Sequence, residues 1–232
     1  MLENPPIMTV CRRLPRPGEA QIAAFRGMPT SFVADAMDGV GALAAGIGPI
    51  GFGRDLDCVA VGPALTADNA PGDVLATLAA AELLRPGDVV VAAVQGFQGC
   101  AAAGDRVMGV LKNAGAAGFV TDGPMRDYDG IVAAGLPAWC TGLTPNSPAI
   151  TGPGRVGFPV QVGGRPVATG DMIVADRDGV VVVPFAMIDT VADRLARVRE
   201  AELALDAEIG GGLKSFAAAA ELLASDRCRY TD

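Results

Sequence analysis

The sequence predicts a single domain of mixed α/β class. Three observations point to it: strands and helices alternate in the middle third of the chain, two β-hairpin patterns follow, and one long amphipathic helix comes near the end. The 232 residues are enough for one sizeable hydrophobic core. No linker, low-complexity run or internal repeat divides them.

The N-terminal quarter contains few regular elements. Its first 17 residues are rich in Pro and Arg, and we expect an extended arm there. Thr30-Ser31 begins a short helix, because hydroxyl side chains favour helix N-termini. The glycine-rich residues 40–55 predict a loop. A strand is expected over residues 58–64, ending at Gly62-Pro63.

The middle third carries the alternating pattern. Its predicted elements are a helix over 74–84, a buried strand over 89–94, a helix over 104–114 closed by Gly115, a strand over 119–121 and a short helix over 129–134. Strands connected through helices pair in parallel, so we expect a parallel sheet here.

The last third predicts antiparallel structure and then helix. One hairpin is expected over 158–168, with its turn at Gly163-Gly164, and a second over 171–183. A long amphipathic helix follows over 185–209, and the glycines at 210–212 interrupt it before an Ala-rich tail helix. We therefore divide the chain into an N-terminal arm at 1–17, a main domain at 18–209 and a C-terminal tail at 210–232.

The composition excludes several classes of function. Lys and Arg number 18 against 26 Asp and Glu, so the net charge is −8, and aromatic residues make up 5%. An acidic surface with few aromatic side chains is unsuited to nucleic acids. Histidine is absent, which removes imidazole metal sites and every catalytic couple that needs a His base. No P-loop or G-x-G-x-x-G motif occurs.

The five cysteines and the N-terminus indicate the compartment. The cysteines are scattered and form no C-x-x-C pair, so neither a disulfide framework nor a zinc site is expected. Glu3, Pro5-Pro6 and the lack of an early apolar stretch argue against a signal peptide, and the longest apolar runs are too short to span a membrane. A reduced cytoplasm is the expected location.

Two short segments carry residues suited to chemistry. Gly104-Asp105 opens a predicted helix after a buried strand and a glycine-dotted loop, where free N–H groups can receive an anion. Asp122-Gly123-Pro124-Met125-Arg126-Asp127 follows the next strand. There Arg126 offers a cation for a substrate carboxylate, and Asp127 a hard oxygen ligand for Mg²⁺ or Mn²⁺. The alternative is that Asp127 caps a helix beside a solvated Arg126.

These segments resemble the RraA-like family, which includes class II 4-hydroxy-4-methyl-2-oxoglutarate/4-carboxy-4-hydroxy-2-oxoadipate aldolases. The resemblance covers roughly residues 30 to 205 and is most specific in two places, Gly104-Asp105-Arg106-Val107 and residues 115–127. Shorter matches support it, at Val33-Ala34-Asp35-Ala36, Pro71-Gly72-Asp73, Pro86-Gly87-Asp88 and Asp176-Arg177-Asp178-Gly179. The fold it implies is an α/β/α or β/β/α sandwich of the swivelling phosphohistidine-domain type, with residues 18–209 as the catalytic domain.

The resemblance also implies a mechanism. Asp127 would be the one direct protein ligand of a divalent metal, usually Mg²⁺, and Arg126 would bind the keto-acid oxygens and stabilise an enolate. Backbone N–H groups over Gly104, Asp105, Arg106 and Val107 would receive the substrate carboxylate. Asp105 would position a metal-bound water that takes the proton of the C4 hydroxyl, so that C3–C4 breaks and pyruvate enolate remains. The expected substrate is 4-hydroxy-4-methyl-2-oxoglutarate or a related 4-hydroxy-2-keto acid, with oxaloacetate decarboxylation as a side activity.

Several alternatives stay open at this point. The family assembles as homotrimers or homohexamers and uses a carboxylate from a neighbouring subunit, which Glu200 or Glu202 would match; pairing along a helix explains both glutamates equally well. Asp122 either orients metal waters or serves a turn, and Tyr128 either lines the pocket or lies on a helix surface. Some RraA proteins bind and inhibit an RNA-degrading endonuclease, so a protein-binding regulator without aldolase chemistry is the other function class.

Overall fold

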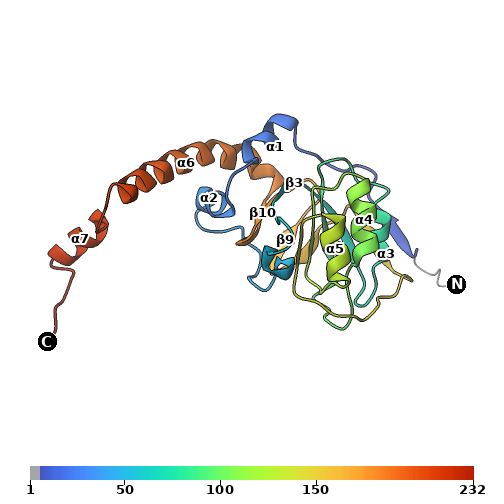
Figure 1. The fold of residues 1–232 in the computed structure, drawn as a ribbon. Helices are drawn as coiled ribbons and strands as arrows, with labels where there is room; N and C mark the ends of the chain where they lie inside the picture. Colours follow the sequence, from blue (N-terminus) through green and yellow to red (C-terminus); the bar gives the residue numbers. More distant parts are fainter. Residues whose placement is uncertain (1–5) are drawn as a thin grey trace.

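A nine-stranded mixed sheet runs through the body of the protein, and one long helix extends away from it (Figure 1). The structure is a computed structural model and describes residues 6–232. Its strands are β1 (Met8–Val10), β2 (Gly48–Pro49), β3 (Ala60–Asn69), β4 (Val89–Ala93), β5 (Gly118–Thr121), β6 (Ala138–Cys140), β7 (Gly154–Val156), β8 (Val160–Val162), β9 (Arg165–Val167), β10 (Met172–Asp176) and β11 (Gly179–Val183). Its helices are α1 (Glu19–Phe25), α2 (Thr30–Ala36), α3 (Leu75–Ala80), α4 (Asp105–Asn113), α5 (Tyr128–Ala134), α6 (Ile188–Gly210) and α7 (Ala217–Ala224), with 3-10 turns η1 (Ile50–Gly53) and η2 (Phe185–Met187).

The parallel centre of the sheet confirms the alternating pattern of the middle third. Strands β3, β4, β5 and β6 lie side by side in parallel. All five residues of β4 are buried, which explains its uninterrupted run of Val and Ala. Helices α3, α4 and α5 pack together on one face of these strands (Figure 1). The carboxyl ends of β4 and β5 therefore meet at one edge, just before α4 and α5 begin.

The predicted end of the first long strand was wrong. Strand β3 does not stop at Gly62-Pro63 but continues to Asn69. Pro63 lies where the strand changes partners: it pairs with Met172 of β10, and the pairing with β4 begins one residue later at Ala64. Because the ladder needs no donor from residue 63 at this crossover, proline is tolerated inside a long strand.

Two hydrophobic cores hold the body together. The larger one surrounds β3–β6 and includes Trp139, which is fully buried and donates its indole N–H to the carbonyl of Asp176 at 2.8 Å. The smaller one lies where α1, α2 and the start of α6 pack on β10 and β11, and it includes Phe25, Val181 and Leu195. The second hairpin, β10–β11, is thus the surface that joins the terminal helices to the central sheet.

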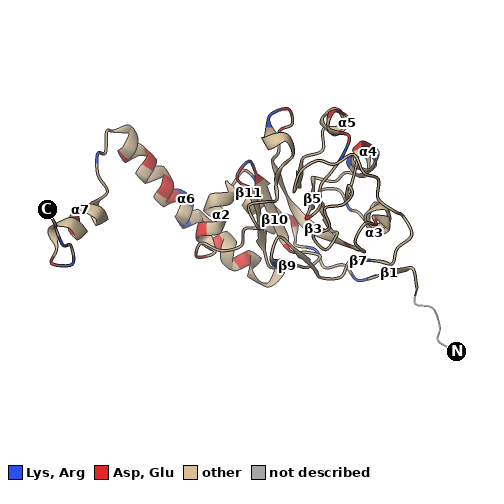
Figure 2. Ribbon diagram, turned by 90° about the horizontal axis from the view of Figure 1, so that it is seen from below, with Lys and Arg blue, Asp and Glu red and all other residues tan. Residues whose placement is uncertain are grey.

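The two ends of the chain differ. Residues 1–5 of the predicted arm lie outside the described residues. The rest of the arm contacts the body: β1 pairs in parallel with β7, and Arg16 forms an ion pair with Asp88. Helix α6 is buried only in its first turns, then leaves the body with acidic residues along it, and α7 lies beyond (Figure 2). No helix within residues 6–232 is long and apolar enough to cross a membrane.

Candidate active site

Both chemistry-bearing segments lie at helix N-termini on the same edge of the sheet. Gly104 is the N-cap of α4, and Asp127 is the N-cap of α5. The backbone joins the two segments, because Arg126 donates its N–H to the carbonyl of Ala103 at 3.1 Å. The N–H groups in the first turn of a helix have no partner within that helix, so two sets of donors face this edge.

Asp127 has an unusual backbone conformation. Its φ is +62°, in the left-handed region that Asp tolerates better than most residues but still adopts at a cost. Its carboxylate makes no capping hydrogen bond to α5, and its side chain is 45% exposed. The expected alternative, a conventional side-chain cap, is therefore not what the structure has. The strained backbone instead presents an exposed carboxylate at the helix end, where its Oδ2 lies 3.3 Å from Nε of Arg126.

Two glycines let the helix ends approach each other closely. A Cβ at Gly104 would lie 2.6 Å from Oδ2 of Asp127 and 3.2 Å from Nε of Arg126. A Cβ at Gly130, on α5, would lie 2.6 Å from both the Cβ and Oδ2 of Asp105. Any side chain at either position would fill the space around the two carboxylates. The backbone angles of Gly104 suit any residue, so backbone conformation does not explain the glycine. The reason for it is the space that the site needs.

The guanidinium of Arg126 is held from two sides. Its Nε lies 3.3 Å from Oδ2 of Asp127, and its Nη1 donates a hydrogen bond to the hydroxyl of Ser147. Ser147 belongs to the loop after β6, which is fastened to the site by the N–H of Thr144 donating to the carbonyl of Met125 at 2.9 Å. Sequence reasoning missed Ser147, because its loop contains no motif and meets Arg126 only in three dimensions.

A cavity of about 410 Å³ lies between the two helix N-termini. It is lined by the residues singled out in the sequence, which are Gly104, Asp105, Arg106, Val107, Arg126 and Asp127. One of the first-turn donors is already used, since the N–H of Arg106 donates to Oδ1 of Asp105 at 2.7 Å. A neighbouring cavity of about 280 Å³ shares Arg126 and Asp127 and continues along Tyr128, Leu143, Thr144 and Pro145.

The donor set around Asp127 fits a hydrated hard cation. Within the part of the chain that the structure describes, no three Asp, Glu or Cys side chains converge on one metal position. Mg²⁺ needs no such cage, because it keeps several waters and takes one or two carboxylates. The exposed carboxylate of Asp127 and the space left by the missing Cβ of Gly104 meet that requirement.

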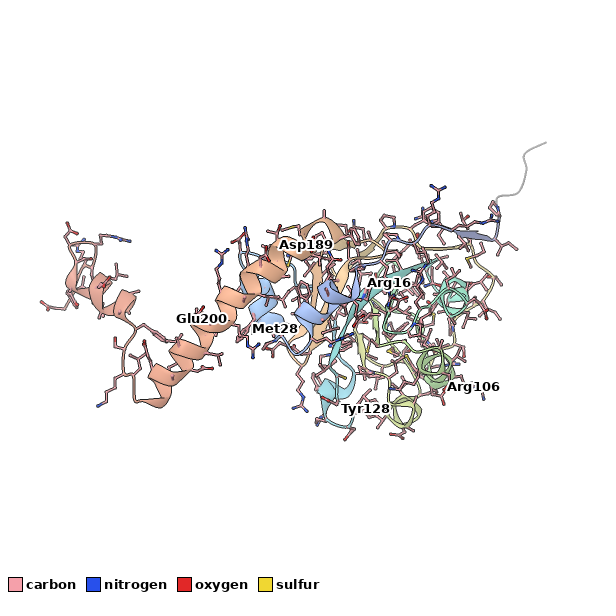
Figure 3. All side chains as sticks on the ribbon, turned by 90° about the horizontal axis from the view of Figure 1, so that it is seen from above. Arg16, Met28, Arg106, Tyr128, Asp189 and Glu200 are labelled. Atoms are coloured by element: carbon pink, nitrogen blue, oxygen red, sulfur yellow. The ribbon has the colours of Figure 1, made fainter. Side chains whose placement is uncertain are left out.

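Three residues considered in the sequence lie elsewhere or are otherwise engaged. Asp122 accepts hydrogen bonds from the N–H groups of Val94 and Gly96 and lines a different cavity, so it serves a turn. The hydroxyl of Tyr128 donates to Asp55 at 2.7 Å, and this hydrogen bond raises the pKa of the phenol. Glu200 lies on the part of α6 that leaves the body, well away from Arg106 and Tyr128 (Figure 3).

Comparisons with known proteins agree with this architecture. The family described as RraA-like, Aldolase/RraA, matches residues 30–182. A protein of Halalkalibacterium halodurans, named provisionally as a 4-hydroxy-4-methyl-2-oxoglutarate aldolase, is 40% identical over 78% of this chain and 84% of its own length. The solved structure of Streptomyces coelicolor RraAS2, described as an unusual member of the RNase ES inhibitor RraA family, is 29% identical with a TM-score of 0.70, over 83% of this chain and all of its own.

A further solved structure supports the fold but, at its lower identity, nothing more. An uncharacterised protein from Pseudomonas syringae pv. tomato has a TM-score of 0.75 at 24% identity, and the match covers 87% of this chain and 93% of the other. The predicted mixed α/β single domain with the RraA-type fold is thereby confirmed.

Proposed function

The chain belongs to the RraA-like family, and from that premise we propose that it is a divalent-metal-dependent class II aldolase. Its substrate would be 4-hydroxy-4-methyl-2-oxoglutarate or a related 4-hydroxy-2-keto acid, and pyruvate its product. The observation that carries the proposal is the single cavity in which Arg126, Asp105, Asp127 and the N-terminus of α4 meet. In this proposal residues 18–209 form the catalytic domain, with the arm at 1–17 and the tail at 210–232 outside it.

The cavity offers complementary groups for the keto-acid end of the substrate. The substrate carboxylate accepts hydrogen bonds from backbone N–H groups in the first turn of α4, where the helix dipole favours an anion. The backbone N–H of Arg106 already donates to the carboxylate of Asp105, so we assign the backbone N–H groups of Asp105 and Val107 as donors to the substrate. Arg126, fixed by Ser147 and Asp127, is directed at the keto oxygen.

Cleavage needs one proton acceptor and positive charge where the enolate forms. Asp105 orients a water that takes the proton of the 4-hydroxyl, and the C4–O bond becomes a carbonyl. The C3–C4 bonding electrons form the C2=C3 bond, while the π electrons of the C2 carbonyl move onto the keto oxygen to give the enolate. Asp127 would hold the divalent cation, and the chemistry that this cation would supply is stabilisation of the negative charge of the enolate. The guanidinium of Arg126 donates hydrogen bonds to the enolate, and water returns a proton to C3 to give pyruvate. No step requires histidine or a Schiff-base lysine.

The same stabilisation of pyruvate enolate supports oxaloacetate decarboxylation. Loss of CO₂ from oxaloacetate leaves the electron pair on the carbon that becomes C3 of pyruvate, so Arg126 would meet the same developing charge. We therefore expect this as a side activity at the same cavity.

The working form is proposed to be a homotrimer or homohexamer. Glu200 lies on the part of α6 that leaves the body, away from Arg106 and Tyr128 (Figure 3), and Glu202 follows it in the same helix. In this proposal one of these two glutamates reaches the cavity of a neighbouring protomer. A carboxylate from the neighbour would then complete the set of acids around the water that Asp105 orients.

A second candidate function is a protein-binding regulator of ribonuclease activity that lacks aldolase chemistry. The similarity to RraAS2 over the whole length of that chain favours it. A regulator of this kind would use its surface and would have no need for the strained Asp127 beside Gly104.

The two functions separate in an assay of pyruvate release, coupled to lactate dehydrogenase, from 4-hydroxy-4-methyl-2-oxoglutarate and from oxaloacetate. We expect turnover with Mg²⁺ or Mn²⁺, none with EDTA, and none in Asp127→Ala. Folded, metal-loaded protein that turns over neither compound and binds neither pyruvate nor oxalate would favour the regulator.

A further inference from the structure

A second and larger cavity, of about 700 Å³, opens at the carboxyl ends of β3 and β4. It shares no lining residue with the cavity of Arg126 and Asp127. In open α/β sheets, ligands bind beyond the carboxyl ends of the strands, and pockets of this volume hold small organic molecules. The aldolase chemistry proposed above makes no use of this cavity.

A residue in an unfavourable conformation lines this cavity. Gln95 has φ +57° and Gly96 has φ +69°, and the N–H of Phe97 donates to the carbonyl of Val94 at 3.1 Å. Two consecutive positive φ angles with that hydrogen bond define a type I′ turn, whose first central position favours Asn, Asp or Gly. Gln is not among these residues, so position 95 carries a backbone cost. The amide Nε2 of Gln95 donates to the carbonyl of Asn69 at 3.5 Å, a long hydrogen bond.

The turn is locked by a buried carboxylate. Asp122 accepts the N–H of Val94 at 2.7 Å and that of Gly96 at 2.8 Å, and these two N–H groups flank Gln95. Only 9% of Asp122 is exposed. Each of its two oxygens accepts one backbone N–H of the turn. Its effect is to hold Gln95 at the cavity wall.

The remaining polar groups form a neutral set that can both donate and accept. Nε and Nη2 of Arg155 donate to the same oxygen, Oδ2, of Asp68, so the pair has no net charge but keeps Oδ1 and the remaining guanidinium N–H groups. The guanidinium carbon lies 5.6 Å from the centre of the Phe158 ring. Gln161, like Gln95, adds an amide that donates and accepts.

We propose that this cavity binds a neutral polyhydroxylated molecule, a sugar or polyol. Each hydroxyl group of such a molecule donates and accepts, as do the two glutamine amides and the Arg155–Asp68 pair. Arg155 is already paired with Asp68, and Asp122 already accepts two backbone hydrogen bonds, so a charged ligand would have to compete with these contacts. The apolar walls, formed by Ile47, Ala93 and Val160 among others, suit the C–H surface of a sugar ring.

The test is a titration of the ¹⁵N-labelled full-length chain, followed by the side-chain amide signals of Gln95 and Gln161. The neutral probes are D-glucose, maltose, myo-inositol and the acyclic sorbitol; D-gluconate is the charged counterpart. We expect saturable shifts of both amides with at least one neutral probe and weaker shifts with gluconate. A response to cyclic but not acyclic probes would identify a sugar site.

Gln95→Gly supplies a variant that must fold if the structure is right. Glycine adopts φ +57° without strain, so thermal unfolding should move to higher temperature while affinity for the neutral probe, followed at Gln161, falls at least about tenfold. Arg155→Gln should weaken binding similarly, and Arg194→Gln, which breaks a surface pair with Asp38 outside the cavity, should not.

Three results would overturn the proposal. The first is no saturable shift with any neutral probe, and the second is a response to gluconate alone. The third is unchanged affinity in Gln95→Gly. None of these results affects pyruvate release at the cavity of Arg126 and Asp127, so the sugar-site proposal can fail while the aldolase proposal stands, and the reverse.

Discussion

The two cavities at the carboxyl ends of the strands are built in opposite ways. The cavity at Arg126 and Asp127 takes all six of its lining residues from two short stretches of chain, each at the start of a helix. The larger cavity draws on loops and strands from Ala44 to Gly164 and uses single side chains from many of them. The residues of the first cavity can therefore be recognised in the sequence as a motif. The residues of the second cavity come together only when the chain folds.

The two sites also carry charge differently. Arg126 and Asp127 contact each other at 3.3 Å, Asp127 makes no capping bond, and both side chains are at least one-third exposed, so a ligand can reach both charges. In the larger cavity the side chain of Asp68 is 17% exposed and paired with Arg155, and Asp122 accepts two hydrogen bonds from backbone N–H groups. A site for charged intermediates and a site for neutral ligands can thus occupy one edge of the same sheet.

The largest effect is expected from Arg126→Met, which keeps the length of the side chain and removes its charge. Loss of one preorganised group that stabilises developing charge lowers kcat by about 10²- to 10³-fold. Steady-state rates of pyruvate release measure it, with Arg194→Met as the matched control. Equal rates in the two variants would contradict the role of Arg126.

Gly104→Ala tests the close approach of the two helices. The backbone at position 104, with φ −133°, accepts alanine, but the new Cβ would meet Oδ2 of Asp127 at 2.6 Å. Displacing that carboxylate should cost about 100-fold in pyruvate release without unfolding the protein. Gly109→Ala, in the same helix and free of neighbours within 4 Å, should keep full activity and gain about 0.5–1 kcal/mol of stability.

Ser147→Ala addresses how Arg126 is held. The exposed hydroxyl accepts a hydrogen bond from a charged group, an interaction of about 1.5–3 kcal/mol, so kcat should fall at least about tenfold. Ser147→Thr should retain the activity because it keeps the hydroxyl. A loss confined to thermal stability, with unchanged kcat in Ser147→Ala, would show that Ser147 does not position Arg126.

The smallest effect concerns Asp122 and the pH dependence of stability. Burial raises the pKa of Asp122 despite the hydrogen bonds from Val94 and Gly96. The folded state then holds this proton more tightly than the unfolded chain, so the contribution of Asp122 to the free energy of unfolding is full below the ordinary carboxyl pKa and declines as pH rises through the raised value. Denaturant unfolding of the wild type and Asp122→Asn measures it: their difference should shrink with rising pH. A difference that grows with pH would contradict the sign.

The sequence was informative wherever local chemistry decided the structure. The Val-rich run at 89–94, the glycine at position 115 and the Gly163-Gly164 turn predicted β4, the end of α4 and the first hairpin, because each depends on neighbouring residues alone. The strand end predicted at Gly62-Pro63 was wrong because a proline is tolerated there only through the pairing with β10, a strand distant in sequence.

The same division holds within the sites. The helix-start motifs predicted which residues would gather at the smaller cavity, since each motif fixes several residues at once. Ser147 and the Arg155–Asp68 pair come from segments with no signature and meet their partners across 21 and 87 positions of chain. Only tertiary packing brings such residues together, so no local pattern predicts them.

The central claim is that the Arg126–Asp127 cavity generates pyruvate enolate, and it can be tested with pyruvate alone. Proton NMR in D₂O follows the loss of the methyl signal as deuterium replaces hydrogen at C3, which requires enolate formation and no knowledge of the rest of the substrate. We predict exchange that depends on Mg²⁺, stops with EDTA and is lost in Asp127→Asn and Arg126→Met. Exchange no faster than in protein-free buffer, or exchange that persists in both variants, would contradict the account.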